Sequence, residues 1–192
     1  MDDQLLDKQI GERVRSRREE LGISLEELAA RSGVSRSMIS KIERVESSGT
    51  AVLLSKLCSG LGLTLSGLMA DAERPVRTVM RRSEQVTWRD PESGFTRRIV
   101  SPPQSGSAVE IVEIELPPGA RVGFEAWKIR AYEQHLVVLD GTLSLTIANK
   151  CVDLKPGDCA QMSVKTDNKF ENRSKKTVRY LVVIKNNRDF SS

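Results

Sequence analysis

Apolar residues in the first third of the chain recur at the spacing of helix faces. In residues 10–21, Ile10, Val14 and Leu21 fall on one side of such a helix, and Gly22 follows as a stop signal. The same pattern recurs in four further segments, which are residues 24–32, 35–44, 50–61 and 63–69. In the fourth helix, the expected buried stripe consists of Val52, Leu53, Leu57 and Leu61. We therefore predict five short helices, which are enough for a small compact domain.

The second and third helices carry clear boundary signals. Ser24 and Glu27 have the spacing of a capping box, in which each side chain bonds the backbone N–H of the other residue. Gly33 stands where the chain must turn sharply, and Ser35 is suited to cap the helix that follows. The apolar stripe of that helix consists of Met38, Ile39 and Ile42. Two short helices joined by a tight turn are typical of a helix-turn-helix.

The polar face of the third helix is the candidate surface for DNA. In a helix-turn-helix the second helix of the motif lies in the major groove. The residues expected along the groove are Ser35, Arg36, Ser37, Ser40, Lys41 and Arg44. Arg36 is the best candidate for a bidentate contact to guanine. Three further residues complete the predicted DNA-binding set: Arg13 and Thr50, which are expected at the DNA backbone, and Ser24.

Residues 10–69 resemble a known DNA-binding family. The similarity rests on LGISLEELA, SGVSRSMISKIER, ESS and LGLTLSGLM, and it is to the XRE family, whose domain is shared with lambdoid phage repressors and Cro. The resemblance implies an ion pair between Arg18 and Glu43 that ties the first helix to the recognition helix. The chain departs from the family at Arg44-Val45, where Gly or Asn-Gly is usual, and at Gly49, where Pro is usual. Neither departure touches an expected base contact.

The pattern changes from helical to strand-like after residue 71. Residues 71–75 are polar and end at a proline, as expected of a linker. Short β-type runs then follow at residues 76–80, 95–100, 109–116, 135–139, 142–147, 159–164 and 177–184. Asp140-Gly141 lies between two such runs and predicts a hairpin turn. Evenly spaced short strands indicate a sandwich or a barrel.

Residues 109–184 resemble the cupin family, whose fold is a jelly-roll barrel. The similarity rests on LPPGA, LVVLDGTLSLTI, LKPGDCAQMSV and KFENRSKKTVRYLVV. We therefore predict a multidomain chain: an all-α five-helix helix-turn-helix domain of the lambda-repressor type, followed by an all-β cupin jelly-roll barrel. The expected boundaries are residues 1–70 for DNA binding, 71–76 for the linker, and 77–188 for a sensor and dimerisation domain.

The positions that hold metal ligands in cupins are altered in this chain. By the resemblance, those four places fall on Lys128, Arg130, Gln134 and Asn168. Protonated Lys and Arg offer no lone pair, and amides are poor ligands for transition metals. We therefore expect no metal and no cofactor. His135, the only histidine, should point to the opposite face of its strand from Gln134. It is expected to pack on that strand, with a place in the site as the alternative.

Two cations at a barrel mouth suggest an anionic ligand. Arg can hold a carboxylate or phosphate in a bidentate fork, and Lys adds a point charge. The alternative is that Lys128 and Arg130 are solvated at a strand edge, where such residues deter edge pairing. Arg121 and Gln161 are further candidates for lining the site.

Composition is consistent with a cytoplasmic regulator. The chain has 192 residues, 39% of them hydrophobic, and a net charge of +4. The first 72 residues carry ten Lys and Arg against eleven Asp and Glu, so DNA binding depends on where charge lies. No long apolar run predicts a membrane span, and the acidic N-terminus does not resemble a signal peptide. The three cysteines, Cys58, Cys151 and Cys159, do not form a disulfide pattern. Cys151 and Cys159 facing each other as a redox pair is the alternative to small buried side chains.

These observations favour a homodimeric transcriptional regulator, with repression as the expected direction. Symmetric dimers bind palindromic double-stranded operators, and a barrel is a suitable dimerisation unit. Strands within residues 76–100 are candidates for pairing with the partner chain. The barrel is expected to sense a small effector, for which an anion is one candidate, or only to dimerise. A cupin enzyme with an accessory DNA-binding domain is the alternative of a different class, and bound stoichiometric iron, manganese or zinc would favour it.

Overall fold

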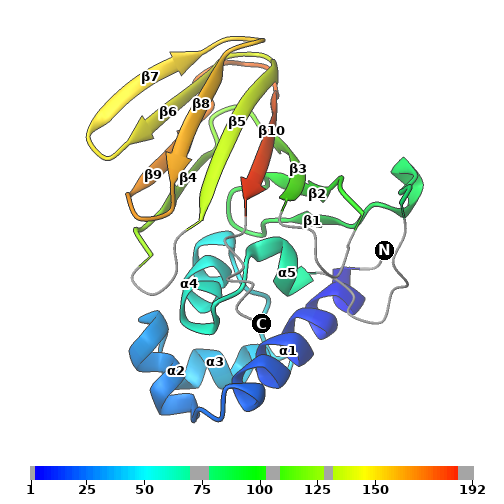
Figure 1. The fold of residues 1–192 in the computed structure, drawn as a ribbon, viewed down its shortest axis with the longest axis vertical. Coiled ribbons are helices and arrows are strands. Elements are labelled where there is room, and N and C mark those ends of the chain that lie inside the picture. The colour runs from blue at the N-terminus through cyan, green and yellow to red at the C-terminus, as the bar shows by residue number, and fades with distance from the viewer. Residues whose placement is uncertain (1–2, 70–77, 103–108, 128–131, 186–192) are drawn as a thin grey trace, which may run out of the picture.

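A computed structural model describes residues 3–69, 78–102, 109–127 and 132–185. The helices gather at one end of the molecule and the strands at the other (Figure 1). The helices are α1 (Asp3–Glu20), α2 (Leu25–Ser32), α3 (Arg36–Glu43), α4 (Ala51–Leu61) and α5 (Leu65–Met69). All five predicted helices are present, but α1 begins seven residues earlier than the apolar pattern from Ile10 suggested.

The predicted capping residues form the helix ends. Ser24 Oγ accepts from the N–H of Glu27 at 3.1 Å, and the Glu27 carboxylate accepts from the N–H of Ser24 at 2.7 Å. Ser35 Oγ accepts from the N–H of Met38 in the same manner, and Thr50, which was not predicted as a cap, accepts from the N–H of Leu53 at the start of α4. Gly33 has a left-handed φ of 70°, which a side chain would strain. Local sequence therefore fixes where α2, α3 and α4 begin, as well as the turn between α2 and α3.

The buried side of α4 differs from the predicted stripe. Leu57 and Leu61 are buried as expected, but Val52 and Leu53 are only partly buried. Leu54 is fully buried in their place. The error follows from geometry: the prediction assumed one apolar face, whereas α4 packs on α2 and also on the barrel strand β4. The two contact surfaces together bury most of the circumference of the helix.

The strands form two antiparallel sheets. The larger has the order β1-β2-β3-β10-β5-β8 and the smaller the order β4-β9-β6-β7. The strands are β1 (Thr87–Arg89), β2 (Thr96–Ile99), β3 (Val109–Leu116), β4 (Arg121–Phe124), β5 (Glu133–Asp140), β6 (Leu143–Ile147), β7 (Lys150–Leu154), β8 (Cys159–Ser163), β9 (Asn168–Glu171) and β10 (Val178–Lys185). A short 3-10 helix, η1 (Arg82–Glu84), precedes β1. The two sheets enclose a common core that includes Leu116, Leu136, Leu143 and Leu145.

Three predictions about the strands are corrected. Residues 76 and 77 of the first expected strand lie outside the described residues, and residues 78–80 are not strand. Asp140-Gly141 is not a hairpin turn, because β5 pairs with β10 and β8 whereas β6 pairs with β7 and β9. Gly141, with a φ of 81°, instead carries the chain from one sheet to the other. The strands β1, β4, β7 and β9 were not predicted, because they are short or mostly polar.

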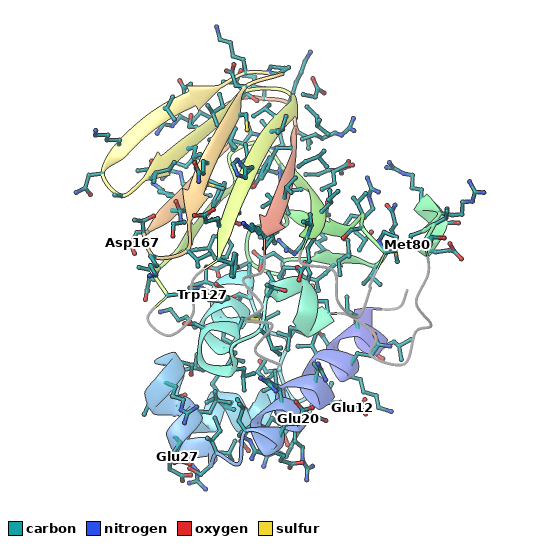
Figure 2. All side chains as sticks on the ribbon, viewed as in Figure 1. Glu12, Glu20, Glu27, Met80, Trp127 and Asp167 are labelled. Carbon is teal, nitrogen blue, oxygen red and sulfur yellow. The ribbon has the colours of Figure 1, made fainter. Side chains whose placement is uncertain are left out.

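Polar contacts join the helices to the barrel. Asp90, which is 3% exposed and follows β1, accepts from the N–H of Ala51 at the start of α4 at 2.8 Å. Lys56 of α4 pairs with Glu125 at 2.8 Å. Figure 2 shows Trp127 where the strands meet the helices. Its indole N–H donates to Ser55 Oγ of α4 at 3.2 Å. Thr64 and Ser66 at α5 also bond to Glu110 and Arg97 of the barrel, so these polar contacts run through α4 and α5 rather than through the α2–α3 pair.

Candidate nucleic-acid interface and barrel cavity

The third helix lies at the end of the molecule away from the barrel. Figure 1 shows α3 between α2 and α1, with α4 and α5 between it and the strands. Its inner side is held by Ile39 and Ile42, which are buried, while Met38 is partly buried against the same core. The predicted groove residues Ser35, Arg36, Ser37, Lys41 and Arg44 are exposed, and Ser40 is partly buried. The helix therefore presents a polar face that the barrel leaves uncovered.

The cations of this face have different local partners. Arg36 Nε lies 2.7 Å from Glu26 Oε1 in a pair whose side chains are both about two-thirds exposed. Arg44 pairs with Glu46 at 2.9 Å. Exposed pairs of this kind contribute little to stability and are readily exchanged for another anion. Lys41 forms no ion pair with any described residue. These side chains can therefore turn to a phosphate or a base at small cost.

The hydroxyl groups of the predicted set are mostly engaged in capping. Ser35 Oγ accepts from Met38 and lies 3.2 Å from Ser37 Oγ. Ser24 and Thr50 cap α2 and α4, so each stands at a helix N-terminus, where free backbone N–H groups attract anions. Arg13 on α1 has a side chain 31% exposed and lies 3.8 Å from Glu20.

An ion pair locks the recognition helix to α1. Arg18 Nε donates to Glu43 Oε1 at 2.7 Å and Arg18 Nη2 to Glu43 Oε2 at 2.9 Å. The side chains are 14% and 7% exposed. The hydrogen bonds to Glu43 raise the pKa of Arg18 above its ordinary value, outweighing the opposing effect of burial. This confirms the pair implied by the XRE resemblance and excludes both side chains from base contacts.

The departure at the end of α3 has a structural consequence. Val45 has a φ of 59°, in the left-handed region that glycine adopts without strain. A β-branched residue is unusual there. Gly49 is buried, and a Cβ added to it would lie 2.5 Å from Leu54 Cδ2. Val45 therefore adopts, with strain, the left-handed backbone that the usual glycine would adopt freely. At Gly49, the Leu54 side chain occupies the space that a Cβ would need.

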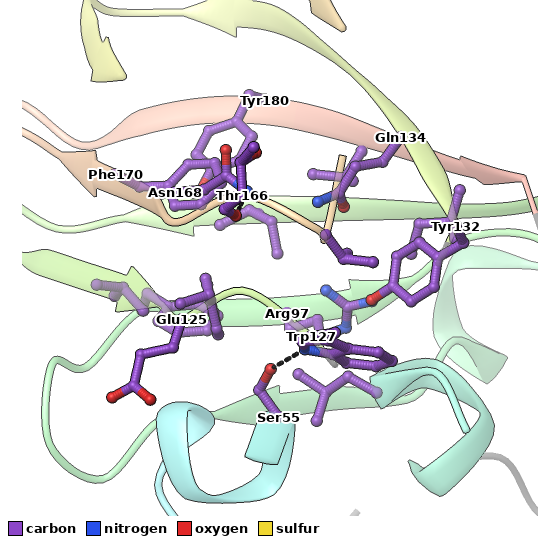
Figure 3. Close-up of a pocket in the computed structure, with 18 residues that line it drawn as sticks. Ser55, Arg97, Glu125, Trp127, Tyr132, Gln134, Thr166, Asn168, Phe170 and Tyr180 are labelled. Atoms are coloured by element: carbon purple, nitrogen blue, oxygen red, sulfur yellow. Dashed lines mark hydrogen bonds between the residues drawn. The ribbon is translucent and has the colours of Figure 1, made fainter. Parts of the chain in front are cut away.

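The barrel contains a cavity that extends to the helices. Its volume is about 70 Å³, and one water needs roughly 10–15 Å³ of such space, so it can hold about five non-hydrogen atoms. Figure 3 shows its labelled walls. Aromatic side chains dominate them: Phe95, Phe124, Trp127, Tyr132, Phe170 and Tyr180. Ser55 of α4 and Leu65 of α5 close the helical side. An occupant would therefore touch both domains.

The predicted ligand residues separate into three groups. Gln134 and Asn168 line the cavity. Arg121 does not line the cavity: its side chain is 70% exposed and pairs with Glu171 at 3.0 Å. Gln161 does not line it either, because it is exposed and lies opposite His135 on the outer face of β5 and β8. Lys128 and Arg130 lie outside the described residues. His135 is exposed on the face opposite Gln134, as the strand pattern predicted, but it is not packed.

Sequence reasoning missed Arg97 in this cavity. Arg97 lies on β2, is 8% exposed, and lines the cavity. A signal was available, because Phe95, Arg97 and Ile99 alternate with Thr96 and Arg98 and therefore share one face of a strand. A cation between two buried apolar residues of one face marks an inward-facing charge. Trp127 and Ser55 gave no such signal, because only the packing of α4 on the barrel brings them together.

The described residues hold no group of three or more His, Cys, Asp or Glu side chains that could bind a metal ion. Cys58 is buried in α4, where burial raises the pKa of its thiol. Cys151 and Cys159 are exposed on strands of different sheets and are not paired. The suggested facing of Cys151 and Cys159 across a strand pair is therefore wrong, and so is the expectation that both are small buried side chains. Within the described chain, no helix combines the length and the apolar character needed to cross a membrane.

Comparisons with known proteins agree with both domains. Residues 14–68 match the helix-turn-helix family model HTH_3, and residues 112–184 match the cupin domain model Cupin_2. The HTH-type transcriptional regulator SutR of Escherichia coli (strain K12) is 26% identical over 163 residues, covering 85% of this chain and 86% of SutR.

One solved structure shares the architecture of the whole chain. The crystal structure of an HTH_3 family transcriptional regulator from Vibrio cholerae superposes with a TM-score of 0.81 and 22% identity. The superposition covers 97% of this chain and 100% of that one. Hydroxypropylphosphonic acid epoxidase from S. wedmorenis is more distant, with a TM-score of 0.49 and 14% identity over 94% of this chain and 98% of the epoxidase.

Proposed function

We propose that this chain, which joins an N-terminal helix-turn-helix domain to a C-terminal cupin domain, is a sequence-specific DNA-binding transcriptional regulator. The observation that carries the proposal is the uncovered polar face of α3. Arg36, Lys41 and Arg44 are exposed on it, while Ile39 and Ile42 hold the opposite side in the core. A helix of this kind, rigidly held and free on its polar side, fits the major groove.

The contacts divide into those that read bases and those that hold the backbone. Arg36 has the guanidinium fork that pairs with guanine O6 and N7, and Glu26 holds it at the N-terminal end of the helix. Ser37 and Lys41 lie along the same face, with Ser35, Ser40 and Arg44 beside them. Ser24 and Thr50 stand at helix N-termini, which suit phosphate groups. Arg13 completes the backbone set.

The protein acts as a homodimer in this proposal. One helix-turn-helix reads few bases, whereas a symmetric dimer reads a palindromic operator whose half-sites lie about one helical turn apart. In the larger sheet β2 is paired on both sides, so β1 and β8 form its edges. Of the strands expected to reach a partner, β1 is therefore the one left with a free edge. Occupancy of the operator then represses transcription in the cytoplasm.

The barrel supplies dimerisation and senses a small anionic metabolite in this proposal, with no chemical reaction. The support is the small cavity that touches both domains. Metal analysis of the purified protein tests this part. Stoichiometric, tightly bound iron, manganese or zinc would contradict it and favour a cupin enzyme.

Selection of bound DNA from a random pool tests the regulator proposal. We expect the full chain to enrich a two-fold-symmetric sequence. The same selection with Arg36→Ala should relax the preference at one base position in each half-site, because one bidentate contact is removed. Arg173→Ala, which removes an exposed arginine of the barrel, is the matched control and should select the parent sequence. A pool that stays random with the parent chain would overturn the proposal.

A further inference from the structure

The cavity between the barrel and the helices contains a buried arginine without a counter-ion. Arg97 is 8% exposed, and among the described residues no carboxylate lies within ion-pair distance of it. Its Nη2 donates to Ser66 Oγ of α5 at 2.9 Å, and its buried Nε has no hydrogen-bond partner. A buried, incompletely bonded guanidinium is costly unless something else neutralises it.

Neighbouring groups do not supply the missing charge. Glu110 influences Arg97 only from beyond ion-pair distance, and its carboxylate accepts from Thr64 of the helical domain. Burial lowers the pKa of Arg97, yet arginine remains protonated in proteins. Glu125 lines the cavity as well, but it pairs with Lys56. The positive charge of Arg97 therefore has no ion-pair partner among the residues that the structure describes.

A second buried atom indicates what else the occupant carries. Asn168 is 4% exposed, and its Nδ2 donates to the carbonyls of Ser163 and Thr166. Its Oδ1 is buried without a donor. Figure 3 shows that Arg97 and Asn168 line the same cavity and that Tyr132 lies beside Arg97. Burial raises the pKa of the Tyr132 phenol, so it remains protonated and able to donate.

We propose that this cavity binds a compact hydroxycarboxylate, with its carboxylate on Arg97 and its hydroxyl donating to Asn168 Oδ1. This rests on the proposed function and names the ligand class of the sensing site. A carboxylate matches the guanidinium, a hydroxyl satisfies the orphaned acceptor, and room for about five non-hydrogen atoms limits the ligand to acids of the size of glycolate or lactate.

The same arginine connects the ligand to the DNA-binding domain. Ser66 belongs to α5, and it is the only described hydrogen-bond partner of Arg97. A carboxylate that draws the guanidinium into the cavity competes with Ser66 and changes how α5 contacts β2. Binding can alter DNA affinity only if the ligand favours one arrangement of the two domains over another. The Arg97–Ser66 bond provides such a difference.

Thermal unfolding of the full chain with glycolate and lactate tests the site. Each acid should raise the melting temperature by mass action, whereas glycolamide, the neutral isostere of glycolate, should not. Arg97→Met should weaken glycolate binding roughly tenfold or more, because it removes a charge-assisted bond. Its own melting temperature should not fall, since it removes an uncompensated buried charge. Arg173→Met, outside the cavity, is the matched control and should retain the rise.

Tryptophan fluorescence places the ligand in the cavity. The chain has two tryptophans, so Trp88→Phe leaves only Trp127, which lines the cavity. Glycolate should change its emission in the single-tryptophan protein and should not do so once Arg97→Met is added. The site is overturned if neither acid raises the melting temperature, if glycolamide acts equally, or if Arg97→Met keeps the response.

Measurements of operator affinity test whether glycolate binding in the cavity is transmitted to the DNA-binding domain, separately from whether glycolate binds. Glycolate should change the operator affinity of the parent roughly fivefold or more. Ser66→Ala should still bind glycolate but should lose most of that change, and an undiminished change would overturn transmission through Ser66. Unliganded Arg97→Met also lacks the Arg97–Ser66 bond, so it should bind the operator with the affinity of the glycolate-bound parent and should not respond to glycolate. Loss of operator binding by the unliganded parent would contradict the proposed function instead.

Discussion

The face of α3 and the cavity of the barrel place their cations in opposite surroundings. The Arg36 side chain is 66% exposed and has a nearby carboxylate that it can exchange, whereas Arg97 is 8% exposed and forms no ion pair with any described residue. An exposed cation suits a large polyanion that approaches from solvent, with affinity that falls as salt rises. A buried cation suits a small ligand that replaces its hydration completely. The same residue type therefore serves two kinds of recognition.

The two regions also differ in how the chain builds them. The ends of α2 and α3 are fixed by Ser24, Glu27 and Ser35, each acting within three residues along the chain. The cavity instead needs Ser55, Arg97 and Tyr180 at one place. Mutations at the ends of α2 and α3 should therefore affect the stability of one helix, whereas mutations in the cavity should affect several elements at once. The predictions below test this contrast.

The largest expected effect is at Arg18, the long-range contact of the helical region. Arg18→Met leaves the Glu43 carboxylate, 7% exposed, without its partner. Breaking a buried pair from one side costs about 3–5 kcal/mol, so the free energy of unfolding in urea should fall by that order. The double variant Arg18→Met/Glu43→Met should recover much of the loss. A loss in the double variant equal to the sum of the losses in Arg18→Met and Glu43→Met would show that the pair does not couple.

Asp90 tests the junction between the regions. Asp90→Ala leaves the buried N–H of Ala51 without an acceptor and also removes the bond to the Ser93 N–H. An unsatisfied buried donor costs about 1–3 kcal/mol, and we expect a loss of that size in denaturant unfolding. Hydrogen exchange should show faster exchange at the start of α4. Unchanged exchange there would mean that the barrel does not stabilise this helix end.

Val45 is a β-branched residue with a left-handed backbone conformation, which is unfavourable for its side chain. A left-handed φ costs an L-residue about 1–2 kcal/mol, and glycine adds about 0.5–1 kcal/mol of unfolded-state entropy. Val45→Gly should therefore stabilise the protein by about 0.5–1 kcal/mol, seen as a higher urea midpoint. Ala148→Gly, at a φ of 52°, is the matched comparison. A destabilised Val45→Gly would show that contacts of the valine outweigh its strain.

The smallest expected effect is at Glu27, a purely local contact. The backbone N–H of Ser24 and then its hydroxyl lower the pKa of Glu27. A lowered folded pKa gives stability that is present above the unfolded value, about 4.3, and lost as pH falls through the folded value. Glu27→Gln should therefore lower the stability slightly near neutrality, where the carboxylate contributes, and leave it unchanged in acid, where Glu27 is protonated, so the acid side of the stability profile becomes flatter. A loss that is the same at every pH would assign the effect to packing.

Local contacts also explain what could be predicted from the sequence. The caps at Ser24 and Ser35 and the turn at Gly33 depend on neighbours a few residues away, and all were predicted. The failures at Asp140-Gly141 and Leu54 concern which sheet or domain a residue meets, and no short pattern encodes that. Arg97 is intermediate, because the strand alternation shows that it faces inward but not what surrounds it.

The affinity of the full chain for its selected operator tests the central claim most directly, that the face of α3 reads DNA. Titrations with the parent, Arg36→Ala and the barrel control Arg173→Ala are compared over a range of salt. Arg36→Ala should cost about 1–3 kcal/mol, roughly a five- to 150-fold weaker affinity. Arg173→Ala should match the parent, and all three affinities should fall as salt rises. Equal affinity of the parent and Arg36→Ala for the operator would contradict the assignment of α3 as the recognition helix.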